Sequence, residues 1–265
     1  MEILTILLSG LFTLISPVGL VADQVAEGLI RERLVQADLI DVRIDNGPSY
    51  QLLNGRVERV RLAGRGVYPI ADLRIDTIDV ETDAIDIDIA AAQRGQILLD
   101  EPLSSAAHLV LKTEDINQFL QSELIQGLLT NLRFNLPNSS GAREANRYGL
   151  TNPRVIFLSE NRLQVLIDLE DRVLDETVEA TVDLGLMVVD GHQLVLVEPV
   201  VTLDEQPVPR QLLASFIEGI RDDLTLKYFE RWGVTTRILQ FELLPEGLDL
   251  AIFVRVDPDS SLLEN

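Results

Sequence analysis

The sequence predicts an α+β protein in which long antiparallel strands alternate with a few amphipathic helices. Three observations lead to this prediction. Beyond residue 41, apolar and charged residues repeatedly alternate with period two, which is typical of strands with one buried face. Two segments, 113–129 and 209–228, place apolar residues at helical spacing, and each follows a run of such strands. A long uncharged apolar segment lies near the start of the chain.

The composition excludes several classes of function. The 265 residues include 43 acidic and 22 basic side chains, a formal charge of −21, which argues against binding of nucleic acid. There is no cysteine and there are two histidines, so disulfides, thiolate chemistry and a histidine-rich zinc site are not expected. Apolar residues make up 46% of the chain but aromatic residues only 5%. The hydrophobic content is therefore mainly aliphatic.

The segment from Ile3 to Ala22 carries no charged side chain and is long enough for a bilayer-spanning helix. A cleaved secretory signal fits poorly, because no basic residue precedes the apolar run. A buried helix is the second alternative. An uncleaved anchor fits best, since proline and glycine are tolerated in membrane helices. We therefore expect residues 1–22 to attach the protein to a membrane.

The segment "VADQVAEGLIRERLVQADLI", residues 21–40, continues a helical pattern that begins after Pro17. From Asp41 the period changes to two, so a meander of short strands is predicted. Within it, "AGRGVYP" predicts a turn. Its two glycines could also suggest a phosphate-binding loop, but the third glycine of a dinucleotide fingerprint is absent and no helix follows.

The stretch "DTIDVETDAIDIDI", Asp76–Ile89, holds six carboxylates among isoleucines and valines. Ile85 and Ile87 alternate with acids in the opposite parity to Ile78 and Val80, so a bulge or bend is predicted at residues 82–84. This alternation predicts a half-buried strand with an acidic outer face. A calcium site is the alternative, but the glycine and the terminal glutamate of an EF-hand loop are missing. Nothing singles out a catalytic pair of acids.

A second helix is predicted in "LKTEDINQFLQSELIQGLL", with Thr113 as N-cap and acidic residues in its first turn. The following segment, residues 136–153, has turn composition and no periodicity, so it is predicted to be a loop between two halves. In the second half, "RLQVLIDLED" and "TVEATVDLGLMVV" predict strands with a continuous apolar face, and "HQLVLVEPVVTL" predicts a strand covered on both sides. A third helix from Pro209 and a closing hairpin, "RILQFELL" with "LDLAIFVRV", complete the chain.

Three stretches, "GRGVYP", "DVETDAIDID" and "LVLKTEDINQFLQS", resemble the LmeA-like phospholipid-binding family, and "SPVGLVADQVAE" is similar to its cyanobacterial members. The resemblance covers most of the chain. It implies a fold similar to the tubular lipid-binding superfamily, in which a long curved antiparallel sheet wraps around amphipathic helices and a lipid lies in the groove between them. No catalytic motif accompanies it, so it implies a protein that is not an enzyme.

We expect the lipid groove where the second and third helices face the sheet, because acyl chains gain about 0.8 kcal/mol per methylene buried in an apolar slot. Periodicity alone would equally fit an ordinary filled core. No catalytic residue, metal ligand or cofactor is predicted. The predicted lipid-binding residues are Ile116, Phe119, Leu124, Leu128, Val165, Ile167, Leu212, Phe216, Ile220 and Leu224.

The expected function is binding, and transfer, of phospholipid or another acyl lipid by one domain that is tethered to a membrane. The domain is expected to span residues 23–256, as halves 23–135 and 154–256 joined by loop 136–153, with a tail at 257–265. Export to the periplasm or thylakoid lumen fits this function. The alternative is a scaffolding protein of the envelope or photosynthetic membrane that uses its acidic strand face. An enzyme acting on lipid-linked sugars ranks last.

Overall fold

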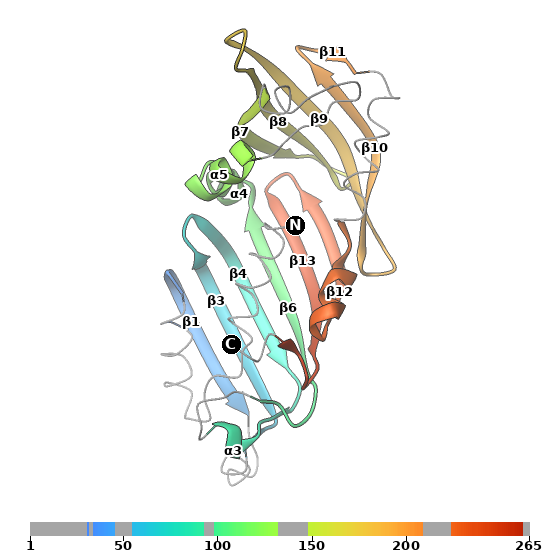
Figure 1. Cartoon of the computed structure of the whole chain (residues 1–265). Coiled ribbons are helices and arrows are strands. Elements are labelled where there is room, and N and C mark those ends of the chain that lie inside the picture. Colours follow the sequence, from blue (N-terminus) through green and yellow to red (C-terminus); the bar gives the residue numbers. More distant parts are fainter. Residues whose placement is uncertain are drawn as a thin grey trace.

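The computed structural model describes residues 31, 34–45, 55–92, 98–131, 148–208 and 224–261. Residues 1–22, which we expected to form an apolar helix, lie outside these ranges. In the described parts of the chain, two open, curved antiparallel sheets follow one another along an elongated molecule, with short helices between and beside them (Figure 1). The prediction of mainly antiparallel structure is confirmed.

The first sheet has six strands and combines the N-terminal meander with the closing hairpin. In spatial order its strands are β1 (Gln36–Asp45), β3 (Arg59–Ile70), β4 (Leu73–Thr82), β6 (Leu103–Lys112), β13 (Gly247–Val256) and β12 (Val234–Leu244). The predicted hairpin is confirmed as β12 and β13. Because β13 pairs with β6 along its whole length, the end of the chain completes a sheet that its beginning started.

The second sheet has five strands and takes its strands only from the middle of the chain. Its order is β11 (Gln206–Pro207), β10 (Gln193–Leu203), β9 (Glu176–Val189), β8 (Arg162–Asp171) and β7 (Tyr148–Phe157). The short elements are β2 (Arg56–Val57) paired with β5 (Ile85–Asp86), the helices α3 (Ile89–Ala92), α4 (Thr113–Leu120) and α5 (Glu123–Asn131), and the 3-10 helix η3 (Leu226–Trp232).

One face of the first sheet forms a filled core. The register places apolar residues side by side across five strands, and one such row is formed by Val42, Leu62, Val80, Ala107 and Ile252. All five are buried. Because side chains alternate between the two faces of a strand, the intervening charged residues point to the other face. Apolar area of this extent supplies the main stabilisation of the domain.

The predicted turn at "AGRGVYP" is wrong, because these residues lie inside β3 and the turn follows at Ala71 and Asp72. Gly64 is required here for packing: a Cβ at this position would meet Cγ2 of Ile78 at 2.6 Å and Cγ2 of Val67 at 2.7 Å. Gly66 adopts a φ of +55°, a conformation that L side chains rarely take. The two glycines therefore let a long strand pass closely over the core.

The helix predicted as far as Ile40 is also wrong at its C-terminal end. Residues 36–45 form strand β1, which pairs with β3 from Gln36↔Tyr68 to Asp45↔Arg59. Ile40 and Val42 are buried against the core. Apolar residues at positions 37, 40 and 44 fit a helix as well as a strand, and pairing with β3 decides between them.

The acidic stretch changes face where we predicted. Ile78, Val80 and Thr82 are buried in β4, the strand ends at Thr82, and Ile85 is buried again in β5. The break at residues 83–84 restores the apolar face. The prediction of a half-buried strand with acids on its outer side is confirmed for β4 and β5, but it is wrong at Ile89, which begins helix α3, where Asp88 Oδ1 accepts a hydrogen bond from Ala91 N at 2.9 Å.

The helix that follows β6 is interrupted. Lys112, not Thr113, is the N-cap of α4, and Thr113 Oγ1 donates to the carbonyl oxygen of Pro245 at 3.0 Å instead. The chain leaves the helix at Gln121 and re-enters α5 after Ser122, whose Oγ accepts a hydrogen bond from Ile125 N. A break of this kind turns one amphipathic segment into two short helices.

Three expectations for the second half change. The predicted loop ends before residue 148, where β7 begins. Strand β10 is not covered on both sides, since none of its residues is fully buried. Thr225 is extended, so the end of the predicted third helix is the separate helix η3. None of the described helices has both the length and the apolar composition of a membrane span.

Replacing Gly64 by Ala should lower the free energy of unfolding by about 1–3 kcal/mol, because the added methyl group would clash with Ile78 and Val67. Gly127 is the matched control: a Cβ there would meet nothing within 4 Å. Gly127→Ala should therefore raise stability by up to about 1 kcal/mol. Urea denaturation measures both changes, and an unchanged midpoint for Gly64→Ala would contradict the close packing.

Candidate functional site

The second sheet presents a long apolar face. Cross-strand pairs such as Val165↔Val182 and Leu196↔Leu186 place residues of the same face next to one another across four strands. This apolar face consists of Leu150, Val155 and Phe157 of β7, Leu163, Val165, Ile167 and Leu169 of β8, Val178, Ala180, Val182, Leu184, Leu186 and Val188 of β9, and Leu194, Leu196, Val201 and Leu203 of β10.

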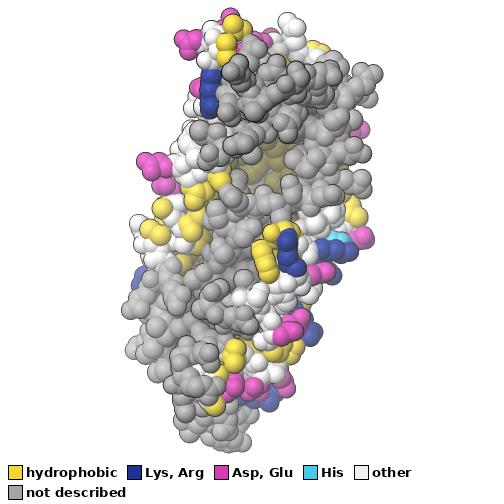
Figure 2. Space-filling model, viewed as in Figure 1, with side chains coloured by type: hydrophobic (Ala, Val, Ile, Leu, Met, Phe, Trp, Pro, Cys, Tyr) yellow, Lys and Arg dark blue, Asp and Glu magenta, His cyan; other side chains and the backbone are white. Residues whose placement is uncertain are grey.

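Burial of the apolar face is uneven: some of its members, including Ala180 (8% exposed), are buried and others are half-buried. Near the first sheet, Phe157, Leu163 and Leu184 are buried together with Leu243 of β12. Farther along, Ile167 and Val178 are only half-buried. The corresponding face of the first sheet contains residues with no exposure at all, such as Ile78 (0%). The first sheet thus has a filled core, whereas the apolar face of the second sheet is incompletely covered. Figure 2 shows apolar side chains at the floor of a recess in this part of the molecule.

Helix α4 closes the buried end of the apolar face. Its Asn117 side chain acts as a strand partner for the edge strand β7: Nδ2 donates to the Val155 carbonyl at 2.8 Å, and Val155 N donates to Oδ1 at 2.7 Å. Gln121 Nε2 donates to the Pro153 carbonyl at 2.6 Å. These bonds satisfy backbone groups that an edge strand would leave open. They also hold Ile116 and Leu120 against the core clusters of both sheets.

The structure brings together some of the predicted lipid-binding residues. Ile116 and Val165 pack in the same cluster beside the apolar face, and Ile167 lies on that face beyond them. Leu224 is half-buried, and its carbonyl oxygen accepts a hydrogen bond from Gln193 Nε2 at 3.3 Å.

Other predicted residues lie elsewhere. Phe119 is buried in the core of the first sheet and Leu128 packs against it. Leu124 belongs to neither core cluster and is 41% exposed. Leu212, Phe216 and Ile220 lie outside the described residues. The predicted set also omitted half-buried members of the apolar face, among them Val182 and Leu196, although the alternation in "TVEATVDLGLMVV" would have identified those of β9.

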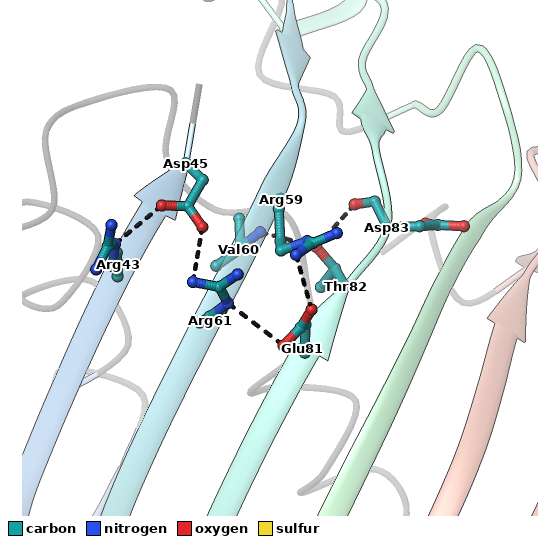
Figure 3. Close-up of polar contacts among 8 residues, drawn as sticks. All are labelled: Arg43, Asp45, Arg59, Val60, Arg61, Glu81, Thr82 and Asp83. Atoms are coloured by element: carbon teal, nitrogen blue, oxygen red, sulfur yellow. Dashed lines mark hydrogen bonds and ion pairs between the residues drawn. The ribbon is translucent and has the colours of Figure 1, made fainter. Parts of the chain in front are cut away.

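The acids of the predicted outer face are largely paired with arginines. Figure 3 shows Glu81 between Arg59 and Arg61, with ion pairs of 3.2 and 3.3 Å, and Arg61 also reaching Asp45 at 2.9 Å. In the ranges that the structure describes, no three His, Asp or Glu side chains are grouped so that they could hold a metal ion. The outer face of the first sheet thus carries a network of ion pairs.

A tighter ion-pair cluster anchors α4 to the first sheet. Asp76 contacts Lys112 at 2.7 Å and Arg74 at 2.9 Å, and Arg74 also contacts Asp115 in the first turn of α4 at 2.9 Å. The hydrogen bond from Lys112 lowers the pKa of Asp76, and that from Arg74 lowers it further, while burial opposes both. In the second sheet, Arg162 lowers the pKa of Asp183 in the same way, with Gln164 as a second donor.

Comparison with known proteins identifies one relationship. A family model described as LmeA-like phospholipid-binding matches residues 14–253. No curated protein and no solved structure matches the chain.

Replacing Asp76 by Asn should lower the free energy of unfolding by about 1–2 kcal/mol at pH 7, because the charged hydrogen bonds to Lys112 and Arg74 are lost. Since folding lowers the pKa of Asp76, its contribution is present above the unfolded value of about 3.9 and is lost as the pH falls through the folded pKa. The difference in the free energy of unfolding between Asp76→Asn and wild type should therefore be present at pH 7 and become smaller below about pH 4.

Asp79→Asn provides the control for this experiment, since Asp79 forms an exposed ion pair with Arg65. It should change stability by less than about 0.5 kcal/mol. Chemical denaturation at several pH values measures both variants. An Asp76→Asn effect that is equally large at pH 3 and pH 7 would exclude the proposed linkage.

Proposed function

Because the chain belongs to the LmeA-like phospholipid-binding family, we propose that it binds phospholipid or another acyl lipid on the apolar face of the five-stranded sheet. The observation that carries this proposal is the difference in burial between the two sheets. The first sheet is filled, with residues such as Val67 and Ile78 fully buried, while Val165, Ile167 and Val182 remain half-buried.

Acyl chains fit the physical character of this face. It is lined by aliphatic side chains from four strands, and polar members of β8 and β9 point to the opposite face. Each methylene that leaves water for such a surface contributes about 0.8 kcal/mol. A diacyl lipid is therefore held mainly by its chains, and the closed end beside Ile116 and Leu120 sets how far the chains can reach.

The proposed site extends the predicted residue set. Ile116, Val165, Ile167 and Leu224 remain in it, and Val178, Val182 and Leu196 join it as half-buried neighbours on the sheet. Phe119, Leu128 and Leu124 remain predictions, as do Leu212, Phe216 and Ile220 of the third predicted helix. We propose that the protein is not an enzyme and that it transfers lipid while residues 1–22 tether it to a membrane.

Native mass spectrometry of the gently purified full-length protein should detect bound phospholipid. Ile167→Trp should reduce the amount of bound lipid, because the indole ring would occupy ligand volume; its register partner on β9 is the small Ala180. The lipid-free variant should keep its stability within about 0.5 kcal/mol. A wild-type protein that is always empty would contradict the proposed function.

The matched control for this substitution is Ile78→Trp in the filled core of the first sheet. Ile78 is fully buried between neighbouring strands, so overpacking should cost about 1–3 kcal/mol or more and lower the melting temperature. If Ile167→Trp behaves like Ile78→Trp and leaves the lipid content unchanged, the second sheet has an ordinary core.

Deletion of residues 1–22 should release the protein from the membrane fraction, because this segment holds the longest uncharged apolar run of the chain. Membrane fractionation with and without the segment measures the change. Lipid bound after purification should be retained, since no residue of the proposed face is removed. Continued sedimentation of the shortened protein with membranes would show that another surface provides the attachment.

A further inference from the structure

The turn between β8 and β9 presents two adjacent aliphatic side chains to solvent. In this turn, Arg172–Asp175, Val173 is 70% exposed and Leu174 is 58% exposed. Single exposed apolar residues are common on protein surfaces. Two in succession at the tip of a hairpin form a small apolar projection.

The conformation of this tip is fixed by hydrogen bonds. Asp171 Oδ1 accepts from Val173 N at 2.9 Å and from Leu174 N at 3.2 Å, and Asp175 N donates to the Asp171 carbonyl at 2.9 Å. Asp175 takes a φ of +57°, which lets the chain return into β9. Because these three N–H groups are paired within the turn, they would not be left unpaired in a less polar environment.

The tip continues the apolar face. Leu169 and Val178 form a register pair on that face, and the last pair of the hairpin, Asp171↔Glu176, leads directly into the turn. The tip lies at the end of the molecule opposite the joint between the two sheets (Figure 1). The tip therefore directly follows half-buried members of the apolar face.

Acidic side chains surround the tip. Asp171, Asp175 and Glu176 flank the two aliphatic residues, and Arg172 is the one cation of the turn. Asp204 and Glu205, in the turn between β10 and β11, lie farther along β9, because Asp204 N donates to the Glu179 carbonyl at 2.9 Å. A surface with this charge is repelled by anionic lipid headgroups within about a Debye length.

We propose that the tip inserts Val173 and Leu174 into the surface of a bilayer of low negative charge, and that acyl chains pass between the bilayer and the apolar face at this end. This inference rests on the proposed lipid-binding function. To that function it adds a surface that contacts the membrane and a preference for membranes of low negative charge. The acidic surroundings determine that preference, and the two aliphatic side chains provide the contact.

Tryptophan fluorescence tests insertion at this position. In full-length Leu174→Trp, addition of phosphatidylcholine vesicles should shift the emission to shorter wavelength, and phosphatidylcholine brominated on its acyl chains should quench it. The chain has one other tryptophan, Trp232, which packs edge-on against Tyr228 in η3, so wild type gives the background signal. Leu239→Trp is the matched control, because Leu239 is 63% exposed on β12 in the other sheet. It should show neither change.

Vesicle charge provides the second arm of the test. Phosphatidylglycerol in the vesicles should weaken the shift at low salt, and added salt should restore it. The double variant Val173→Ser with Leu174→Ser should take up fluorescent phosphatidylcholine from neutral vesicles at least about tenfold more slowly, with an unchanged melting temperature. The lipid retained after purification should also be unchanged.

The outcomes separate this inference from the proposed function. If the emission of Leu174→Trp is neither shifted nor quenched, or if the double serine variant takes up lipid at the wild-type rate, the tip does not contact the membrane. The proposed function still stands in that case, provided that the wild type carries lipid. If the indole of Leu174→Trp inserts but the wild type never carries lipid, the proposed function fails and the membrane contact remains. Stronger insertion into anionic vesicles would overturn the charge preference.

Discussion

The arrangement of this protein depends on how two sheet edges are satisfied without further strands. Strand β7 ends the second sheet, and its backbone is paired by Asn117 of α4 and by Gln121, the C-cap residue of that helix. Strand β12 ends the first sheet, and its backbone donates to two turns of the second: Leu243 N to Asn161 Oδ1 at 2.8 Å and Ile238 N to the Gly191 carbonyl at 2.6 Å. Unpaired backbone groups at a buried edge would be costly. These bonds therefore fix the two sheets end to end.

The joint makes the two apolar faces continuous. Ile116, Leu120 and Leu248 pack against both core clusters, so the filled core of the first sheet passes into the apolar face of the second without a polar boundary. This continuity allows the two sheets to differ in how deeply their apolar residues are buried. The first sheet can supply the stability of the domain, because its rows of aliphatic residues are fully buried. The apolar face of the second sheet is less buried, and the proposed lipid site depends on this difference.

Much of this fold could be predicted from the sequence, because period-two alternation is strong in the segments that became β4, β9 and β13. The change of face between Val80 and Ile85 could even be located to within three residues. Local patterns failed where tertiary contacts decide the outcome. Gly64 and Gly66 have turn composition, yet the strand needs them to pass over Ile78 and to turn its backbone. The spacing around Ile40 is compatible with a helix, but pairing with β3 places this residue in a strand.

The candidate site was only partly accessible to sequence reasoning for a related reason. Alternation identified Val165 and Ile167 as apolar positions, but it cannot say whether the space in front of them is filled. Asn117 looked like an ordinary polar residue on a helix, and only the structure reveals that it pairs with the edge of β7.

The acidity of the chain has two different roles in the described structure. On the outer face of the first sheet, Glu81 and Asp79 are balanced by Arg59, Arg61 and Arg65, so this face offers little free negative charge to a basic partner. This weakens the scaffolding alternative, which depends on an unbalanced acidic face. At the far end of the second sheet, by contrast, acids cluster around Val173 and Leu174 with Arg172 as the neighbouring cation. Ion pairs on the outer face stabilise the first sheet. In the proposed membrane contact, the excess of acidic side chains beside Val173 and Leu174 would favour neutral over anionic surfaces. Acidic residues thus support the fold in the first sheet, and in the proposed membrane contact they would disfavour anionic surfaces.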